Sequence, residues 1–170
     1  MLSEQMLREL NGQVKIEFES AYAYLALSSW CELANFKGGA HFFRLQYEEE
    51  LVHAMKLFDY VVDRRQGKIE LQAIGQPNHS FENLLNGFND ALKSEQLSTA
   101  NIRRILEMAH EERDYATVNI LNWFADEQAE EESLMDYYVD RLELVGTDGS
   151  GLILVDNELL ARKLEPEDSA

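Results

Sequence analysis

Apolar and polar residues alternate along most of the chain with the spacing of one helical face. In four long segments the apolar residues recur at steps of three and four positions, which is the period of an amphipathic α-helix. The first segment follows Ser3, a predicted N-cap, and ends near Asn35. Ser80 and Asp114 are the predicted N-caps of the third and fourth segments. The pattern predicts an all-α four-helix bundle over about residues 4–145.

Two stretches of the chain interrupt this helical period. Residues 68–80, "KIELQAIGQPNHS", contain a Gly and a Pro. Thirteen extended residues reach ~43 Å, close to the ~45 Å length of a 30-residue helix, so we expect a long crossover between helices two and three. After "VGTDGSG", the apolar "LILV" predicts a short fifth helix at about 152–163, followed by an acidic tail at 164–170. The whole chain, 1–170, is predicted to form one domain.

The charge of the chain narrows the classes of partner. Its formal net charge is −17, from 32 acidic and 15 basic residues, so it would repel nucleic acid and anionic membrane surfaces and attract cations. Cys31 is the single cysteine, and the first ten residues lack the pattern of a signal peptide. The longest uncharged stretch, "SAYAYLALSSW", is about half the ~20 residues that a membrane span needs. We predict a cytoplasmic protein with no nucleic-acid or membrane partner.

Each of the four helical stripes contains polar residues at positions where a core requires apolar groups. These residues are Glu17 in the first stripe, Glu50 and His53 in the second, Glu95 in the third, and Gln128 and Glu131 in the fourth. In an antiparallel helix pair, residues equidistant from the connecting turn lie at the same depth. The first two stripes reflect about position 34 and the last two about position 112, so every set lies about 17 residues, or ~26 Å, from its turn. They are therefore predicted to meet near mid-bundle. Glu107 and His110 repeat the Glu-x-x-His spacing beside a turn, and we expect them in solvent.

Buried carboxylates need a partner, because a bare charge in an apolar interior is costly. For any one position taken singly, the partner could be a tyrosine hydroxyl. For the set, four carboxylates carry four negative charges, which two divalent cations would balance. Oxygen-rich ligation with one imidazole and no thiolate suits iron or manganese better than structural zinc. Glu50 and His53 share a helical face, so the carboxylate can bridge two metals while the imidazole binds one.

These residues resemble those of the ferritins, and specifically of the prokaryotic non-haem ferritins. The parent pattern has a Glu from each of two helices and Glu-x-x-His from each of the other two. In this chain "DEQAEEE" places Gln128 and Glu131 where the symmetric version has Glu and His, which argues against a bacterioferritin. The resemblance runs from "LNGQVKIEFESAYAYLALSSWC" through "EEELVHAMKLFDY", "SEQLST" and "NWFADEQAEEE" to "GSGLILVDNELL".

The resemblance implies ligands for three iron positions. The matching residues are Glu17, Glu50 and His53 for the first iron, Glu50, Glu95 and Glu131 for the second, and Glu49, Glu127 and Glu130 for a third. Glu50 would bridge the first two irons, and Gln128 matches a nearby polar residue. Tyr24 matches the tyrosine beside the ferritin site, where it would tune the site or donate an electron. The third position keeps an alternative reading, because acidic residues on an outer helix face are common without a metal.

The resemblance also implies an activity and an assembly. Ferritins are ferroxidases that oxidise Fe²⁺ with O₂ at a dinuclear site and store the Fe³⁺ mineral inside a shell. The implied shell is a homo-oligomer of 24 subunits, with the short fifth helix at a fourfold axis. The apolar "LILV" of that helix is consistent with a partner surface.

Four other interpretations stay open at this point. A haem-binding bacterioferritin could use Met6 or Met55 as haem ligand, although the asymmetric site argues against haem. Another diiron oxidase or peroxidase, as in rubrerythrin-like proteins, would be expected to carry a Cys-x-x-Cys module, which is missing. A DNA-protecting mini-ferritin would be expected to have a basic tail and no fifth helix. A metal-free four-helix interaction protein would leave the shared depth of the six polar residues as coincidence.

Overall fold

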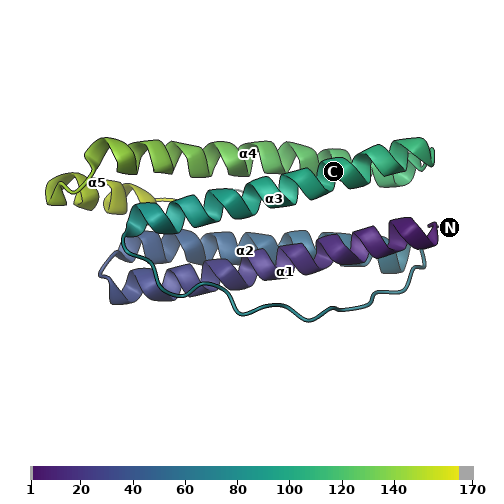
Figure 1. The fold of residues 1–170 in the computed structure, drawn as a ribbon, viewed down its shortest axis with the longest axis horizontal. Helices are drawn as coiled ribbons and strands as arrows, with labels where there is room; N and C mark the ends of the chain where they lie inside the picture. The colour runs from purple at the N-terminus through teal and green to yellow at the C-terminus, as the bar shows by residue number, and fades with distance from the viewer. Residues whose placement is uncertain (1, 165–170) are drawn as a thin grey trace.

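The computed structural model describes residues 2–164 and places four long helices side by side, with a short fifth helix at one end (Figure 1). The elements are α1 (Glu4–Leu33), α2 (Lys37–Asp59), a short π-helical continuation η1 (Tyr60–Arg64), α3 (Leu84–Glu111), α4 (Tyr115–Val145) and α5 (Gly149–Leu160). The described part of the chain contains no strand. The predicted all-α bundle with a long crossover and a short fifth helix is confirmed. Of the predicted acidic tail, residues 165–170 lie outside the described range.

Four of the helices in the described range begin directly after a residue whose side chain caps them. Ser3 Oγ accepts the N–H of Met6 at 3.0 Å, and the Asp114 carboxylate accepts the N–H of Thr117 at 3.3 Å, both as predicted. α5 begins at Gly149, slightly earlier than about residue 152, because the Asp148 carboxylate caps it by accepting the N–H of Gly151 at 2.7 Å.

Ser80 is not the N-cap of the third helix, and that prediction is wrong. The cap is Asn83, whose side chain accepts the N–H of Asn86 at 2.9 Å, and the helix begins at Leu84. The physical reason lies in Phe81, whose ring packs edge-on against Trp30 with 5.6 Å between centroids. This contact keeps the chain around Ser80 in the connection and delays the helix until the next capping side chain.

The crossover runs along the bundle beside α1, as predicted from its length (Figure 1). The Asn11 side chain donates to the carbonyl of Lys68 at 3.1 Å and accepts the N–H of Glu70 at 2.6 Å. Further along, the N–H of Gly75 donates to the Glu19 carboxylate at 3.2 Å. These side chains satisfy backbone groups of an extended segment that has no ladder partner, and they hold it on the outside of the bundle.

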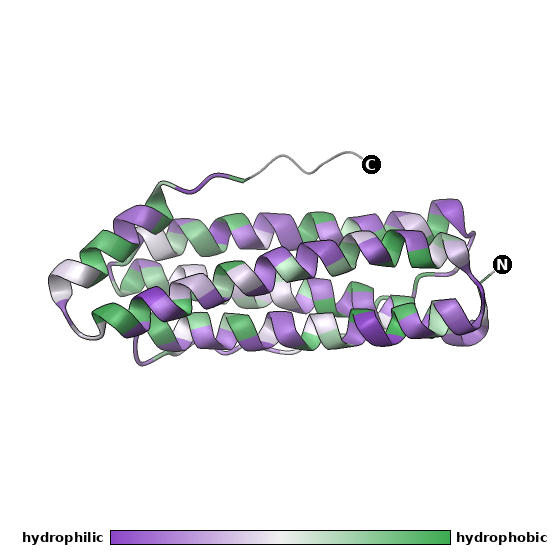
Figure 2. Ribbon diagram, turned by 90° about the horizontal axis from the view of Figure 1, so that it is seen from above, coloured by the Kyte–Doolittle hydropathy of each residue, from purple (hydrophilic) through white to green (hydrophobic). Residues whose placement is uncertain are grey.

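The core consists of two apolar clusters, one toward each end of the bundle. The first contains Tyr24, Leu27, Phe42, Phe43, Phe88, Met135, Tyr138 and Leu142, together with Val155 and Leu159 of α5. The second contains Met6, Leu10, Val14, Leu57, Ile102, Ile105, Leu121 and Phe124. Along every long helix the residues between the two clusters include buried polar side chains. Hydrophilic and hydrophobic residues alternate along each helix in Figure 2, as expected for amphipathic helices. A polar layer therefore divides the apolar core.

α5 folds back onto the start of α2, where the backbones approach very closely. A Cβ atom added to Gly38 would lie 1.6 Å from the carbonyl oxygen of Asp156, so only glycine fits this position. The Asp156 carboxylate accepts the N–H of Gly39 at 2.9 Å and so satisfies a donor at the start of α2. On the other side, Arg141 of α4 pairs with Glu158 at 2.9 Å. These contacts fix where the chain leaves the bundle after α5.

Candidate metal centre

The polar layer at mid-bundle gathers the six residues that the sequence stripes predicted at one depth. All six side chains are buried, with exposures between 0 and 5%. They are Glu17 on α1, Glu50 and His53 on α2, Glu95 on α3, and Gln128 and Glu131 on α4. Tyr24 of α1 lies beside them, stacked on Phe43 with 5.9 Å between ring centroids. Glu107 and His110 lie at the end of the bundle beside the turn, and both are exposed, as predicted.

The tightest group within this layer comes from the first helix pair. One ligand atom each of Glu17, Glu50 and His53 lies within 4.8 Å of the others. Glu50 Oε2 and both ring nitrogens of His53 have no hydrogen-bond partner, although they are fully buried. Unpartnered buried polar atoms are rare in proteins, because each costs desolvation energy. Two carboxylates and an imidazole with free lone pairs are a donor set that fits a divalent cation.

Burial shifts the ionisation of the layer toward its neutral forms. It raises the pKa of Glu17 and, helped by the charges of Glu95 and Glu17, raises the pKa of Glu50 well above its usual value. It also raises the pKa of Glu95 to about 7 and lowers the pKa of His53 to about 4. At neutral pH His53 is therefore a neutral ligand, while burial favours the protonated form of Glu50, whose proton a cation would displace.

The second helix pair presents carboxylates that are already hydrogen-bonded. Glu95 accepts the hydroxyl of Tyr24 and, at 2.9 Å, the amide of Gln128. The same Gln128 nitrogen donates to the Glu95 carbonyl at 3.2 Å. Glu131 accepts the amide of Gln46 at 3.3 Å through one oxygen, while its other oxygen has no partner. This half of the layer must exchange hydrogen bonds before it can ligate a metal fully.

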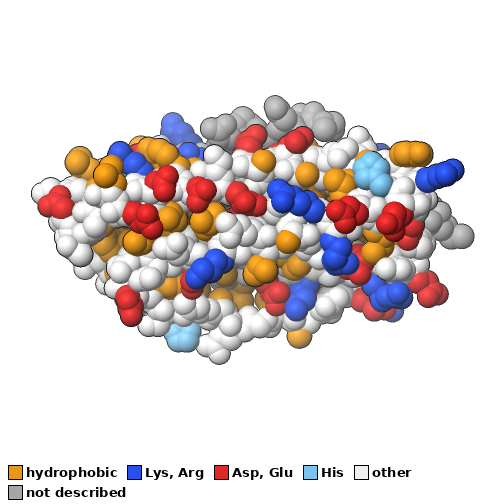
Figure 3. All heavy atoms as spheres, turned by 45° about the horizontal axis from the view of Figure 1, so that its top comes forward, with side chains coloured by type: hydrophobic (Ala, Val, Ile, Leu, Met, Phe, Trp, Pro, Cys, Tyr) orange, Lys and Arg blue, Asp and Glu red, His pale blue; other side chains and the backbone are white. Residues whose placement is uncertain are grey.

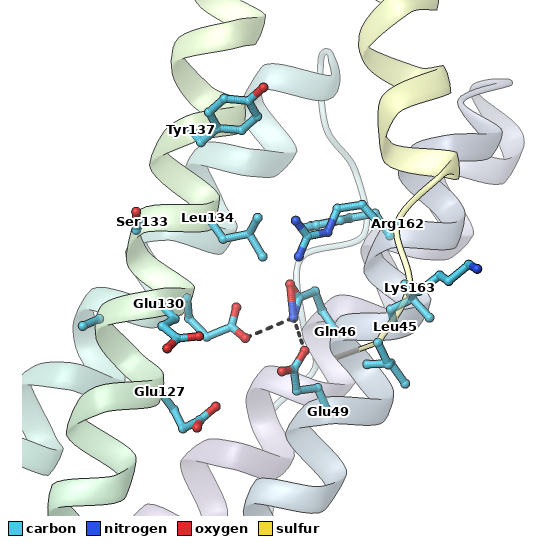
Figure 4. Close-up of a pocket in the computed structure, with 14 residues that line it drawn as sticks. Leu45, Gln46, Glu49, Glu127, Glu130, Ser133, Leu134, Tyr137, Arg162 and Lys163 are labelled. Carbon is cyan, nitrogen blue, oxygen red and sulfur yellow. Dashed lines mark hydrogen bonds between the residues drawn. The ribbon is translucent and has the colours of Figure 1, made fainter. Parts of the chain in front are cut away.

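An open groove between α2 and α4 leads outward from Glu131 (Figure 4). Gln46, Glu49, Glu127 and Glu130 line it, so the residues predicted for a third iron position share one groove. One ligand atom each of Glu49, Glu127 and His53 lies within 4.8 Å of the others, which joins the groove to the buried group. Glu130 is exposed and is not part of that close group.

Two further glutamines belong to this site, and neither was among the residues that the sequence pattern singled out. Gln13 donates from one amide nitrogen to Glu17 and, at 2.9 Å, to Ser98, and its oxygen accepts the Asn101 amide at 2.5 Å. Gln46 bridges Glu49 at 2.9 Å and Glu131. Their spacing was the available signal, since each lies four residues before a buried glutamate on the same helix face.

The charged residues of the chain are predominantly acidic, and the helices in its described part do not have the character of membrane spans. Acidic side chains outnumber basic ones on the face shown in Figure 3, where hydrophobic side chains are exposed between them. In the described range 2–164, no helix has both the length and the apolar character needed to span a bilayer.

Comparisons with known proteins agree on one family. The model of the ferritin-like domain matches residues 7–145. A bacterial non-heme ferritin of Staphylococcus haemolyticus is 39% identical over 167 residues, covering 98% of this chain and 100% of the relative. A ferritin of the archaeon Archaeoglobus fulgidus, described as a novel open-pore ferritin, superposes with a TM-score of 0.93 at 38% identity, covering 95% of this chain and 98% of that one. A humanized archaeal ferritin gives a TM-score of 0.94 at 40% identity, covering 98% and 100%.

Proposed function

The chain belongs to the ferritin family, and from this premise we propose that it is an iron-storage ferritin that oxidises Fe²⁺ with O₂ at the mid-bundle layer. The observation that carries the proposal is the buried group of Glu17, Glu50 and His53, whose ligand atoms lie together and include three without partners. Folding brings these costly groups into the core, and a bound cation would compensate them.

Each residue of the layer has a role in the proposed reaction. Glu17 and His53 would hold the first Fe²⁺, and Glu50 would bridge it to the second after losing its proton. Glu95 and Glu131 would hold the second ion, with Gln128 releasing Glu95 as it binds. Two Fe²⁺ ions give up one electron each, and O₂ takes these with two protons, which balances as two Fe³⁺ and one H₂O₂. The rigid helices contribute by holding both ions at a fixed separation.

Tyr24 and the acidic residues of the groove also have roles in the proposed reaction. The Tyr24 hydroxyl donates to Glu95, so it can adjust the charge on that ligand or supply an electron to the oxidation. Burial and the neighbouring carboxylates, Glu95 first among them, raise the pKa of Tyr24 well above its usual value, so it stays protonated at neutral pH. Glu49, Glu127 and Glu130 would take a third ion on its way to or from the storage space.

A shell of 24 copies in the cytoplasm completes the proposal. Ile153 and Leu154 of α5 are 64% and 66% exposed although the helix packs on the bundle, and Leu71 of the crossover is 71% exposed. Apolar side chains gathered on projecting segments are typical of subunit contacts. Native mass measurement tests the assembly: a particle no larger than a dimer would contradict it.

Iron titration tests the chemistry. Apo protein receives Fe²⁺ without oxygen, bound ions per chain are counted, and O₂ is then admitted while absorbance is followed. Glu50→Ala and His53→Ala should lose bound ions and slow oxidation, whereas His110→Ala, a matched change in the Glu-x-x-His pair at the bundle end, should not. Wild-type rates in both site variants would refute the assignment.

The haem alternative is weaker than the non-haem one. Met6 is buried within an apolar cluster and Met55 is 43% exposed on α2. The bacterial relatives are named non-heme ferritins. A Soret band in the purified protein would reopen the question.

A further inference from the structure

The chain turns back after α5 and crosses the groove between α2 and α4. We call residues Arg162–Leu164 the strap; they line the groove together with Glu127 and Glu131 (Figure 4). The strap is tied down by His41 of α2, whose Nε2 donates to the carbonyl of Arg162 at 2.9 Å. The hydrogen bond between Asp156 of α5 and the start of α2 fixes the point at which the strap leaves α5.

The two basic residues of the strap are placed differently. Arg162 is half-buried, and its guanidinium enters the groove above Gln46 and points toward α4 (Figure 4). Lys163 is exposed, and its side chain extends away from the groove. Adjacent residues of equal charge thus differ in whether they face the acidic lining.

The surroundings of the Arg162 guanidinium are acidic and include unsatisfied oxygens. Carboxylates of Glu49, Glu127, Glu130 and Glu131 share the groove with it. Gln46 Oε1 and Glu131 Oε2 are buried there without hydrogen-bond partners. The guanidinium of Arg162 therefore shares one groove with Glu131, a side chain of the mid-bundle layer.

We propose that Arg162 is a tethered cation that competes with metal ions for this groove, and so controls access of cations to the centre. The inference rests on the proposed function, because it requires that cations pass through the groove. In the metal-free protein the guanidinium reduces repulsion among the carboxylates. An arriving divalent ion brings greater charge to the same oxygens and repels the guanidinium, which can withdraw on its long side chain.

The strap is suited to such movement because the anchors of its backbone are separate from the Arg162 side chain, whose guanidinium interacts with the Tyr138 hydroxyl instead. Its backbone is tied to α2 through the carbonyl of Arg162, while α5 itself is anchored by Asp156 and Glu158. Arg162 can therefore leave the groove without undocking α5. A fixed counter-charge of this kind favours ions that outcompete a guanidinium, and it disfavours weakly bound monovalent ions.

The test compares R162Q with K163Q in the assembled apo protein, using Zn²⁺ as a redox-inert probe in calorimetric titrations. Both variants remove one positive charge from the strap. R162Q should bind the groove ion about tenfold more tightly, because a charge facing the site is removed, while K163Q should change affinity by less than about twofold. R162K, which keeps the charge, should stay close to wild type. H41A, which frees the strap, should move affinity in the direction of R162Q by a smaller factor.

Each outcome has a distinct meaning. Equal affinity in R162Q and K163Q would overturn the inference, because it would leave only long-range charge effects. Weaker binding in R162Q would also overturn it, because Arg162 would then help to position the ligands. Zn²⁺ binding that is unchanged in Glu50→Ala and His53→Ala would instead refute the proposed function. Circular dichroism and native mass establish that each variant is folded and assembled.

Discussion

The two helix pairs meet at the same polar layer, but they bring side chains in different states. From α1 and α2 come Glu17, Glu50 and His53, grouped within 4.8 Å and partly without hydrogen-bond partners. From α3 and α4 comes Glu95, whose oxygens are taken by Tyr24 and Gln128. The first pair therefore holds a largely preformed site, while in the second pair Glu95 is closed by hydrogen bonds and Glu131 keeps one oxygen without a partner.

This difference predicts an order of filling. The first cation gains the His53 nitrogens and Glu50 Oε2, which have no hydrogen-bond partner to give up, and it competes with the Gln13 amide for Glu17. A second cation must displace the amide of Gln128 from Glu95, and each such hydrogen bond to a carboxylate is worth about 1.5–3 kcal/mol. Affinity for the second ion should accordingly be lower, unless the bridging charge of Glu50 compensates.

The strongest test of this comparison removes one ligand from each half. His53→Ala should abolish the first site and reduce the initial oxidation rate by about 100-fold or more, because loss of a ligand exceeds the ~10–100-fold cost of losing an outer-shell partner. Glu95→Ala should also stop oxidation, yet it should still bind Zn²⁺ at the first site with near wild-type affinity. Titration calorimetry distinguishes the two. If both variants lose the same number of ions, the halves are not independent.

A second test removes the hydrogen bond from Gln128 to Glu95 in the second helix pair. Gln128→Glu replaces the amide that holds Glu95 with another carboxylate, so the second ion should bind about tenfold more tightly, at the expense of a less stable apo protein. Asn122→Asp adds the same charge on the exposed side of α4 and serves as the control. Second-ion affinity unchanged in Gln128→Glu would mean that the hydrogen bonds to Glu95 are not the barrier.

The dependence of stability on pH gives a smaller effect with a defined sign. The pKa of Glu95 is raised by burial from 4.5 to about 7, so its stabilising contribution is complete below pH 4.5 and is lost as the pH rises through 7. The pKa of His53 is lowered from 6.5 to about 4, so its contribution is complete above pH 6.5 and is lost as the pH falls toward 4. Between about pH 6.5 and 8 only the carboxylate effect remains. Over this range the deprotonation of Glu95 alone should lower the free energy of unfolding of the metal-free protein by about 1 kcal/mol.

Thermal unfolding across that pH range measures the effect. The metal-free protein should melt at a lower temperature at about pH 8 than at about pH 6.5, and the slope should decrease in Glu95→Gln. Saturation with Zn²⁺ should reverse the slope, because the cation binds the deprotonated ligands. A metal-free protein whose melting temperature rises over this range would show that the layer is not held neutral by burial.

The periodic parts of the site could be predicted from the sequence, and the non-periodic parts could not. Glu50 and His53 interrupt a helical stripe, and counting residues from the turn is enough to place them level with Glu17. The hydrogen bonds from Gln46 to Glu131 and from Gln128 to Glu95 join different helices. No local sequence pattern predicts the side-chain rotamers that form them.

The same distinction explains the errors and omissions elsewhere in the chain. Ser80 and Asn83 are both good capping residues, and the choice between them depends on Phe81 meeting Trp30, a contact between distant parts of the sequence. Arg162 follows the last helix and has no period, so its position in the groove depends on how α5 docks. Sequence periodicity predicts faces and depths, while contacts across the bundle decide the rest.

The smallest test extends the comparison to the turns that join each pair. Asn35, between α1 and α2, and Arg113, between α3 and α4, both have left-handed backbone, with φ of 63° and 55°. Asparagine tolerates this conformation better than arginine does, so the second turn is the more strained. Arg113→Gly should raise the free energy of unfolding by about 0.5–1 kcal/mol, while Asn35→Gly should change it by only a few tenths. Chemical denaturation of both variants under identical conditions measures the difference. Equal effects would mean that the two turns carry the same strain, and that the asymmetry between the helix pairs is confined to the metal centre.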